Sequence, residues 1–246
     1  MLFFRKIVGH SSKRGNVVFY HDMQNLLKFN PKNILFYQEA FTHRSLRKID
    51  QSGVPFNYER LEFVGDAMLG AVIAAYLFRN APTQSEGYLT KMRSKIVNRD
   101  HLNKLGKQLN LIAFLKSKTP KKDIGENVHG NIFEALIGAI YLDRGYVHCD
   151  NFIQDKVISP YVDIPKLERK ITSYKGLIIE WCQKQKKKYC VEIYEDSGNQ
   201  ATKHFSVKIC IDGHLIAKGR ATSKKKAEEQ ASKRVYFALQ EQIKNG

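Results

Sequence analysis

Three acidic residues lie at the start of a strongly apolar stretch: Glu59, Glu62 and Asp66. Glu62 and Asp66 are four residues apart, so in a helix their side chains share one face, about one turn from each other. Like charges at this spacing repel, and burying an unpaired carboxylate costs free energy. The pattern therefore requires either a cation or a set of hydrogen bonds beside the two acids.

Several explanations of these acids stay open at this point. Glu59 is in the first turn and could simply complement the helix dipole, but Asp66 lies two turns further in, beyond the reach of that effect. Arg60 can pair with one acid and not with all three. A divalent cation would make the closeness of two carboxylates favourable, and a buried hydrogen-bond network is the alternative. Gly65 costs about 1 kcal/mol relative to alanine inside a helix, which indicates close approach by another backbone or helix.

A second apolar segment, residues 131–142, repeats the theme. Asn131 and Glu134 are three residues apart and share a helix face. One interpretation is that Asn131 is an N-cap and Glu134 an ordinary first-turn acid. The other is that the two acidic helices converge on one site. A site made of oxygen ligands alone suits Mg²⁺ or Mn²⁺, not zinc.

The elements that must position these residues belong to a helical region from about residue 33 to residue 155. Apolar residues recur there at spacings of three and four, as in Leu89, Met92 and Ile96. Proline, glycine, serine and charge gather at breaks over 48–56, 80–87 and 116–127. The helix that follows Asp66 is apolar on every side, which predicts that it is buried. Residues 1–22 form a basic extension, and a short helix is expected only around 23–28.

After a proline-containing linker over residues 159–171, the pattern of polar and apolar residues changes. Strand-like alternation of polar and apolar residues appears between two helical segments, with Asp212-Gly213 as a hairpin turn. The expected elements are a helix over 175–186, strands over 189–194, 203–211 and 214–221, and a helix over 223–242. The sequence thus predicts an all-α domain over 23–158 followed by a small α+β domain over 172–242, with the order α-β-β-β-α.

The charge of the chain favours a polyanionic partner. Lys and Arg number 41 against 24 Asp and Glu in 246 residues, which gives a net charge of +17. Residues 172–246 hold 15 Lys/Arg and 8 Asp/Glu, so this small domain carries +7. Each phosphate contact by a cation releases bound counterions, which favours nucleic acid as the partner. The short run over 184–188 is by itself a solvated loop.

Other classes of protein fit the sequence less well. No apolar run is as long as the roughly 18 to 20 residues that a membrane span needs, and the start of the chain lacks the pattern of a secretory signal. The four cysteines lack the close pairing of a zinc site and are expected to be thiols in a reducing cytoplasm. They are Cys149, Cys182, Cys190 and Cys210. We therefore expect a cytoplasmic protein with no membrane partner.

Three blocks together resemble the ribonuclease III family. Residues 59–66 (ERLEFVGD) resemble its signature motif, residues 134–143 (EALIGAIYLD) its second acidic block, and residues 42–45 (THRS) its early helix motif. Their order and spacing are those of the family, and the match runs from about 24 to 155. Residues 172–241 resemble a double-stranded-RNA-binding domain, most sharply at 223–228 (SKKKAE).

The resemblance implies a metal-dependent endonuclease. It assigns Glu62, Asp66 and Glu134, with Asn131, to a Mg²⁺ site in which Mn²⁺ is a possible substitute, and no small-molecule cofactor. Asp66 and Glu134 are the expected catalytic residues, and Glu59 matches a further acid in the same cleft. The expected reaction is hydrolysis of double-stranded RNA that leaves 5′-phosphate and 3′-hydroxyl ends, with ribosomal RNA precursors and structured RNAs as substrates. The family usually has Asp at position 131, so this site carries one charge fewer.

The resemblance also implies partners. Family members form homodimers through the signature helix, with Phe63 seated in the partner; the alternative is that Phe63 belongs to the chain's own core. Ser223, Lys224, Lys225 and Glu180 match RNA-contacting positions, and the expected readout is of A-form shape and 2′-hydroxyls. Two departures occur there: Ile179 precedes Glu180, and residues 198–201 (GNQA) replace the usual loop sequence.

Two other hypotheses compete with an active nuclease. The first is a catalytically weak or inactive protein that binds double-stranded RNA on a degenerate nuclease fold, and Asn131 is its support. The second is a basic architectural protein that binds nucleic acid through charge alone. The second hypothesis leaves the buried acids unexplained and predicts equal binding to DNA and RNA duplexes.

Overall fold

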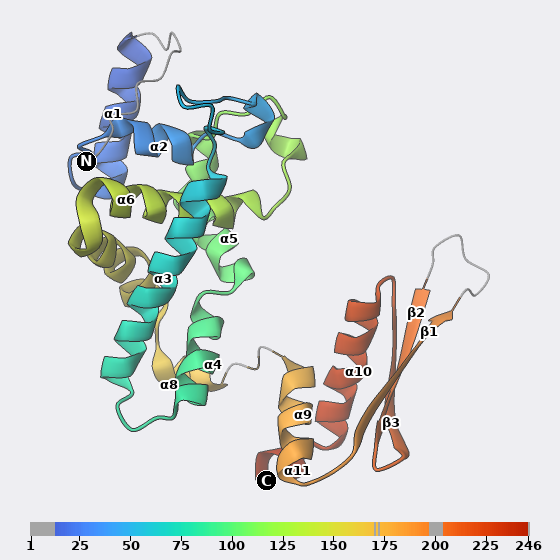
Figure 1. Cartoon of the computed structure of the whole chain (residues 1–246). Coiled ribbons are helices and arrows are strands. Elements are labelled where there is room, and N and C mark those ends of the chain that lie inside the picture. The colour runs from blue at the N-terminus through green and yellow to red at the C-terminus, as the bar shows by residue number, and fades with distance from the viewer. Residues whose placement is uncertain (1–12, 170, 172, 197–203, 246) are drawn as a thin grey trace. The chain divides into compact units, whose positions relative to one another are not determined.

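The computed structural model describes residues 13–169, 171, 173–196 and 204–245 (Figure 1). The chain separates into two compact units, Met1–Leu167 and Glu168–Gly246. The first unit is helical, and the second combines a three-stranded antiparallel sheet with helices. The predicted fold class, an all-α domain followed by a small α+β domain, is confirmed.

The helical unit is assembled around two long helices, α3 (Glu59–Asn80) and α6 (Val128–Ile153), which have the most extensive contact of any two elements. In α6 the helical geometry breaks at Gly145, where φ is 77°. The shorter helices surround this pair. They are α1 (Lys13–Leu27), α2 (Ile34–Ala40), α4 (Glu86–Ile96), α5 (Arg99–Gln108), α7 (Ser159–Tyr161) and α8 (Ile164–Arg169), with a π-helical turn over Gln154–Ile158 and 3₁₀ turns over Arg44–Leu46, Leu111–Ala113 and Lys121–Asp123.

Helices α3 and α6 cross with their backbones almost in contact (Figure 1). A Cβ atom on Gly65 would lie 1.7 Å from the carbonyl oxygen of Glu134, and a Cβ atom on Gly138 would lie 2.2 Å from that of Leu61. The close approach predicted from Gly65 is therefore confirmed. Because both contacts are to backbone atoms, no side-chain movement can make room for a larger residue at either position.

Asp143, the last residue of the second acidic block, fastens α6 to the segment before α2. Its carboxylate accepts hydrogen bonds from the backbone N–H groups of Lys32 (2.9 Å) and Asn33 (2.6 Å) and from the hydroxyl of Tyr37 (2.9 Å). Burial and the neighbouring Asp143 raise the pKa of the Tyr37 hydroxyl far above its usual range. The role of Asp143 is thus to hold two parts of the core together.

Helix α1 is longer than the short helix predicted at residues 23–28. It begins at Lys13, and Phe19, Met23 and Leu27 pack against the core at helical spacing. Residues 13–22 of the predicted basic extension therefore belong to a packed helix, and residues 1–12 lie outside the described part of the chain.

Helix α3 is not buried on every side, contrary to the prediction. Leu61, Leu69 and Val72 are buried, but Phe63 is 78% exposed and Phe78 is 71% exposed. The sequence shows how apolar the helix is, but not that the unit covers only one of its faces. By length and composition α3 is also the one helix in the described residues that could cross a membrane, so the expectation that no apolar run is long enough is wrong for this helix.

The predicted linker over residues 159–171 is largely helical. Helices α7 and α8 fall within it, and Tyr161, Val162 and Leu167 pack against the core of the first unit. Pro160 stands in the first turn of α7. Backbone N–H groups in a first turn have no partner within the helix, so a proline there removes no hydrogen bond and does not prevent helix formation.

The second unit has the predicted order of elements. The sheet is antiparallel, with the strand order β1 (Tyr189–Asp196), β2 (His204–Ile211), β3 (His214–Ala221). Along the chain, helix α9 (Tyr174–Lys184) precedes the strands, and helices α10 (Lys224–Ala238) and α11 (Gln240–Asn245) follow them. Asp212 and Gly213 both have positive φ, as the predicted hairpin turn requires. The predicted last helix over 223–242 is thus two helices with a break at Leu239.

We predict that Gly65→Ala destabilises the protein by at least about 1–3 kcal/mol, because the added methyl group forces α3 and α6 apart. Urea unfolding measures the effect. Gly87→Ala is the matched control, since Gly87 is an exposed helical glycine with nothing within 4 Å of an added Cβ. Equal stability of the two variants would contradict the importance of the crossing.

Candidate active site

The acids of the two long helices line one cavity of about 590 Å³ in the helical unit. Helix α3 contributes Glu59, Glu62 and Asp66, and α6 contributes Asn131 and Glu134. The crossing at Gly65 sets the two helix starts side by side, so residues about 70 positions apart in the chain line the same cavity. The remaining lining residues are Phe63, Val97, Arg99, Leu102 and Gly130.

The start of α6 packs directly against α5. The side chain of Asn103, which is buried, accepts a hydrogen bond from the N–H of Gly130 at 2.9 Å. A Cβ atom on Gly106 would lie 2.1 Å from the carbonyl oxygen of His129, so these two helices also approach closely. Helix α6 begins at Val128, with Asn127 at the N-cap position. The interpretation of Asn131 as an N-cap is therefore wrong.

Burial and repulsion from neighbouring carboxylates disfavour the charges of Glu134 and Glu62. Glu134 is 8% exposed, and its burial, together with the charges of Asp66 and Glu62, raises its pKa from 4.5 to about 7. Burial also raises the pKa of Glu62, and Glu59 and Asp66 add to this effect. Arg99 opposes the shift at both residues, but the shift persists. The cavity therefore concentrates negative charge that the chain itself does not neutralise.

The alternative of a buried hydrogen-bond network does not describe this cavity. Within the described part of the chain, the side chains of Glu62, Asp66 and Glu134 have no hydrogen bond or ion pair. The same residues do not converge closely, and no group of three or more His, Cys, Asp or Glu in the described residues is arranged to hold a metal ion. Repulsion among carboxylates keeps such side chains apart until a cation lies between them.

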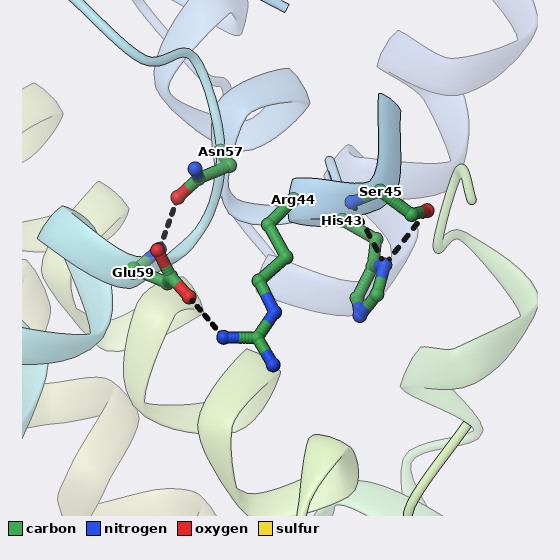
Figure 2. A network of polar contacts seen from close by, with 5 residues as sticks. All are labelled: His43, Arg44, Ser45, Asn57 and Glu59. Carbon is green, nitrogen blue, oxygen red and sulfur yellow. Dashed lines mark hydrogen bonds and ion pairs between the residues drawn. The ribbon is translucent and has the colours of Figure 1, made fainter. Parts of the chain in front are cut away.

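Glu59 lies at the outer edge of the site and is held there by other residues. Its carboxylate pairs with Arg44 at 3.3 Å, and its backbone N–H donates to Asn57 at 2.9 Å (Figure 2). Both charged side chains of the pair are largely exposed, so the pair contributes little to stability. Glu59 is thus a cleft residue with its own partner, unlike Glu62, Asp66 and Glu134.

The residues around Arg44 show what the early THRS motif does. His43 accepts a hydrogen bond from the N–H of Ser45, and the side chains of these two residues lie 2.9 Å apart (Figure 2). The hydroxyl of Ser117 completes the cluster with hydrogen bonds of 3.0 Å to Ser45 and 3.3 Å to His43. Ser45 also accepts from the N–H of Lys118. The motif therefore joins two segments far apart in the chain and presents Arg44 to Glu59.

Two residues of the site were not predicted from the sequence. The Nη1 of Arg99 donates to the Oδ1 of Asn131 at 3.1 Å. The side chain of Asn131 also acts on the hydroxyl of Tyr58, whose pKa it lowers against the stronger effect of burial. Arg99 belongs to no spacing pattern with the acids, so only the packing of α5 on α6 brings it here.

The predicted RNA-contacting residues of the second unit lie on two helices. Ser223 caps α10 by accepting from the N–H of Lys226, and the exposed Lys224 and Lys225 follow in the first turn. Lys224 also lies over the ring of Phe205, with 5.6 Å between its Nζ and the ring centroid. Glu180 is exposed on α9. Residues 198–201, the other departure noted from the sequence, lie outside the described residues.

The packing of α10 on the sheet explains Gly219 of β3. A Cβ atom there would lie 2.2 Å from the carbonyl oxygen of Ala227. The close contact fixes α10 at its first turn, where the three consecutive lysines begin. An ion pair of 2.8 Å between Lys175 and Glu228 joins α9 to the same helix. The sheet thus holds a basic helix start and an adjacent helix face in a fixed arrangement.

Comparison with known proteins decides the family. Residues 33–161 match the family model described as Ribonuclease-III-like, and residues 174–237 match the double-stranded RNA binding motif. The chain is 59% identical over 243 residues to Ribonuclease 3 of Flavobacterium psychrophilum, with 99% of each chain covered. The chain belongs to the ribonuclease III family. It is an endoribonuclease for double-stranded RNA, as its sequence motifs indicated.

Two further relatives agree with this ribonuclease III assignment. Ribonuclease 3 of Zunongwangia profunda is 62% identical over 233 residues, with 95% of each chain covered. The nuclease domain of ribonuclease III from Campylobacter jejuni superposes with a TM-score of 0.51 at 28% identity, and the match covers 57% of this chain and 96% of that domain.

We predict that Glu134→Gln flattens the pH dependence of stability in the metal-free protein. The folded state of the wild type keeps a proton on Glu134 up to pH about 7, whereas the unfolded state loses it near 4.5. Since the unfolded state binds fewer protons in this window, the free energy of unfolding falls as pH rises through it. The Gln variant lacks this loss, on the order of 1–3 kcal/mol.

Urea unfolding in EDTA at pH 5 and pH 8 measures this difference. Glu86→Gln is the control, because Glu86 is an exposed glutamate of α4 outside the cavity. The Glu86→Gln variant keeps the pH dependence of the free energy of unfolding that the wild type has. The same pH dependence in the wild type and in Glu134→Gln would show that Glu134 is not held in a charge-disfavouring position.

Proposed function

We propose that this ribonuclease III hydrolyses phosphodiester bonds of double-stranded RNA with Mg²⁺, and that Glu62, Asp66, Asn131 and Glu134 would hold the ion. The observation that carries the proposal is a set of three carboxylates on α3 and α6 that line one cavity and have no hydrogen-bond or ion-pair partner among the described residues. Burial disfavours the charge of two of them, Glu62 and Glu134. Oxygen ligands of this kind fit Mg²⁺, with Mn²⁺ as a substitute.

When bound, Mg²⁺ supplies an activated water and stabilises charge on the phosphate and on the leaving oxygen. The chain's own contribution is to hold the acids in place before substrate arrives. Asp66 and Glu134 approach from different helices, so the α3–α6 crossing fixes their separation. Asn131 supplies an amide oxygen in place of a carboxylate, and this oxygen retains a second lone pair while it accepts from Arg99. The expected products have 5′-phosphate and 3′-hydroxyl ends.

The double-stranded RNA binding motif would deliver the substrate. Lysines at the N-terminus of α10 suit phosphates across a groove, and a Lys-rich first turn opposes the helix dipole, so it gives no stability of its own. This module reads A-form shape more than base sequence, which suits ribosomal RNA precursors and other structured RNAs as substrates. The four cysteines are free thiols, which supports a cytoplasmic location.

We further propose that the enzyme acts as a homodimer through the exposed face of α3. Phe63, Ala67, Ala71 and Phe78 are exposed along this helix at spacings close to four and seven residues. An exposed apolar stripe of this length is typical of a protein interface. The Campylobacter jejuni nuclease domain is described as having a region involved in dimer formation. Phe63 also lines the acidic cavity, so a partner seated on it would adjoin the site.

The cleavage experiment uses an end-labelled RNA duplex in Mg²⁺. We predict that Glu134→Ala loses cleavage by at least a hundredfold and still binds the duplex, because binding rests mainly on the second unit. Glu86→Ala, an exposed acid outside the cavity, cleaves as the wild type does. Mass spectrometry of the products identifies the ends. A wild type that binds the duplex and cuts it in neither Mg²⁺ nor Mn²⁺ would instead be an RNA-binding protein on a silenced nuclease fold.

The dimer is tested by analytical ultracentrifugation of Phe63→Lys. We predict a shift to monomer at micromolar concentration, because a lysine in an apolar interface must lose its hydration without gaining a partner. Phe237→Lys is the matched control, since Phe237 is an exposed phenylalanine of the second unit. A dimer that survives the Phe63 substitution unchanged would rule out this face as the interface.

A further inference from the structure

Arg99 is the one cation that lines the acidic cavity among the described residues. It stands at the first position of α5, where the side chain of the N-cap residue Asn98 accepts from the N–H of His101 and fixes the start of the helix. Its side chain is exposed toward solvent. With four carboxylates lining the same cavity, its hydrogen bond nevertheless goes to the neutral amide of Asn131.

The type of residue at position 131 decides what this contact does to Arg99. A carboxylate 3.1 Å from a guanidinium would form a charge-assisted pair and engage two of its N–H groups in a fork. The amide of Asn131 accepts one hydrogen bond and carries no charge. Arg99 is therefore held in position while its positive charge remains available to a further anion.

Asn131 also has a neighbour in the core. Its side chain lies close enough to the hydroxyl of Tyr58, which is buried just before the start of α3, to lower the pKa of that hydroxyl. Asn131 thus stands between the buried Tyr58 and Arg99 at the mouth of the cavity. A buried anchor of this kind limits where the guanidinium can go, so less entropy is lost when it binds a ligand.

The free donors of Arg99 fit a phosphodiester. A guanidinium has five N–H donors in a planar fork that matches the geometry of phosphate oxygens, and one of the five is used here. The acids around it repel a phosphate, so a cation at this edge offsets that repulsion where RNA must approach. No acid in the described residues forms an ion pair with Arg99 and competes for this role.

We propose that Arg99 binds a phosphodiester oxygen of the RNA backbone at the mouth of the cavity, and that Asn131 positions Arg99 without neutralising it. The inference rests on the proposed function, since it takes double-stranded RNA as the ligand of this cavity. The inference also explains why Asn stands at position 131. The amide gives the metal site one negative charge fewer, and in return Arg99 keeps a positive charge that faces the substrate.

The test measures binding of a fluorescent RNA duplex to the full chain in EDTA, as a function of salt concentration. The proteins are the wild type, Arg99→Ala, Asn131→Asp and the double variant. Arg99→Ala lowers the slope of log affinity against log salt by about one, since one phosphate contact is lost. Asn131→Asp lowers it as much, because the new carboxylate neutralises Arg99. The double variant shows no further loss, and Arg99→Lys regains most of the slope.

Arg79→Ala is the control for the loss of one surface charge. Arg79 lies near the far end of α3, about 20 Å along the helix from Asp66, and lies outside the cavity. The Arg79→Ala variant leaves the slope of log affinity against log salt unchanged. In cleavage assays with Mg²⁺, Arg99→Ala raises KM several-fold more than it lowers kcat, as expected for a residue that binds substrate.

Three results would overturn the proposal. If Arg99→Ala keeps the slope of Arg79→Ala, Arg99 does not contact the RNA. If Asn131→Asp keeps the slope of the wild type, Asn131 does not control the charge of Arg99. If the losses of the two single variants add in the double variant, the two residues act separately. A wild type that neither binds nor cleaves duplex RNA would instead refute the proposed function.

Discussion

Two helix backbones in direct contact are the constraint on which the rest of this structure depends. Gly65 of α3 and Gly138 of α6 leave no room for any side chain between the helices. Because the acids stand within a turn of these glycines, the distance between Glu62, Asp66 and Glu134 is set by backbone packing and not by flexible side chains. A catalytic arrangement gains from such rigidity, since small displacements of its groups are costly in rate.

The same packing holds the acids in an unfavourable arrangement. Burial and mutual repulsion raise the pKa of Glu134 to about 7, and within the described residues nothing donates a hydrogen bond to its side chain. A protein selected for stability alone would place apolar residues at these positions of α3 and α6. The large core around Leu69, Ile73 and Leu136 supplies the free energy that tolerates this cost. The folded chain thus keeps a site whose most favourable state needs a cation from outside.

The sequence predicted those features that depend on local spacing. The acids at 62 and 66, the close approach at Gly65 and the Asp212-Gly213 hairpin each follow from one short segment, and the structure contains all of them. Features that depend on the tertiary environment were not predictable. The apolar composition of α3 does not reveal that one of its faces stays exposed, and the prolines near 160 suggested a linker where helices pack on the core. Arg99 reaches Asn131 only through the packing of α5 on α6.

The hydrogen bonds of Asp143 divide the second acidic block into residues of two kinds. Glu134 opens the block and faces the cavity, whereas Asp143 closes it and ties α6 to the chain before α2. A relative that had lost the ability to cleave RNA would be free to replace Glu134, yet it would still need Gly138 and Asp143 in order to fold. Most residues of the motif therefore indicate the fold, and only a few of them distinguish an active enzyme from an inactive relative.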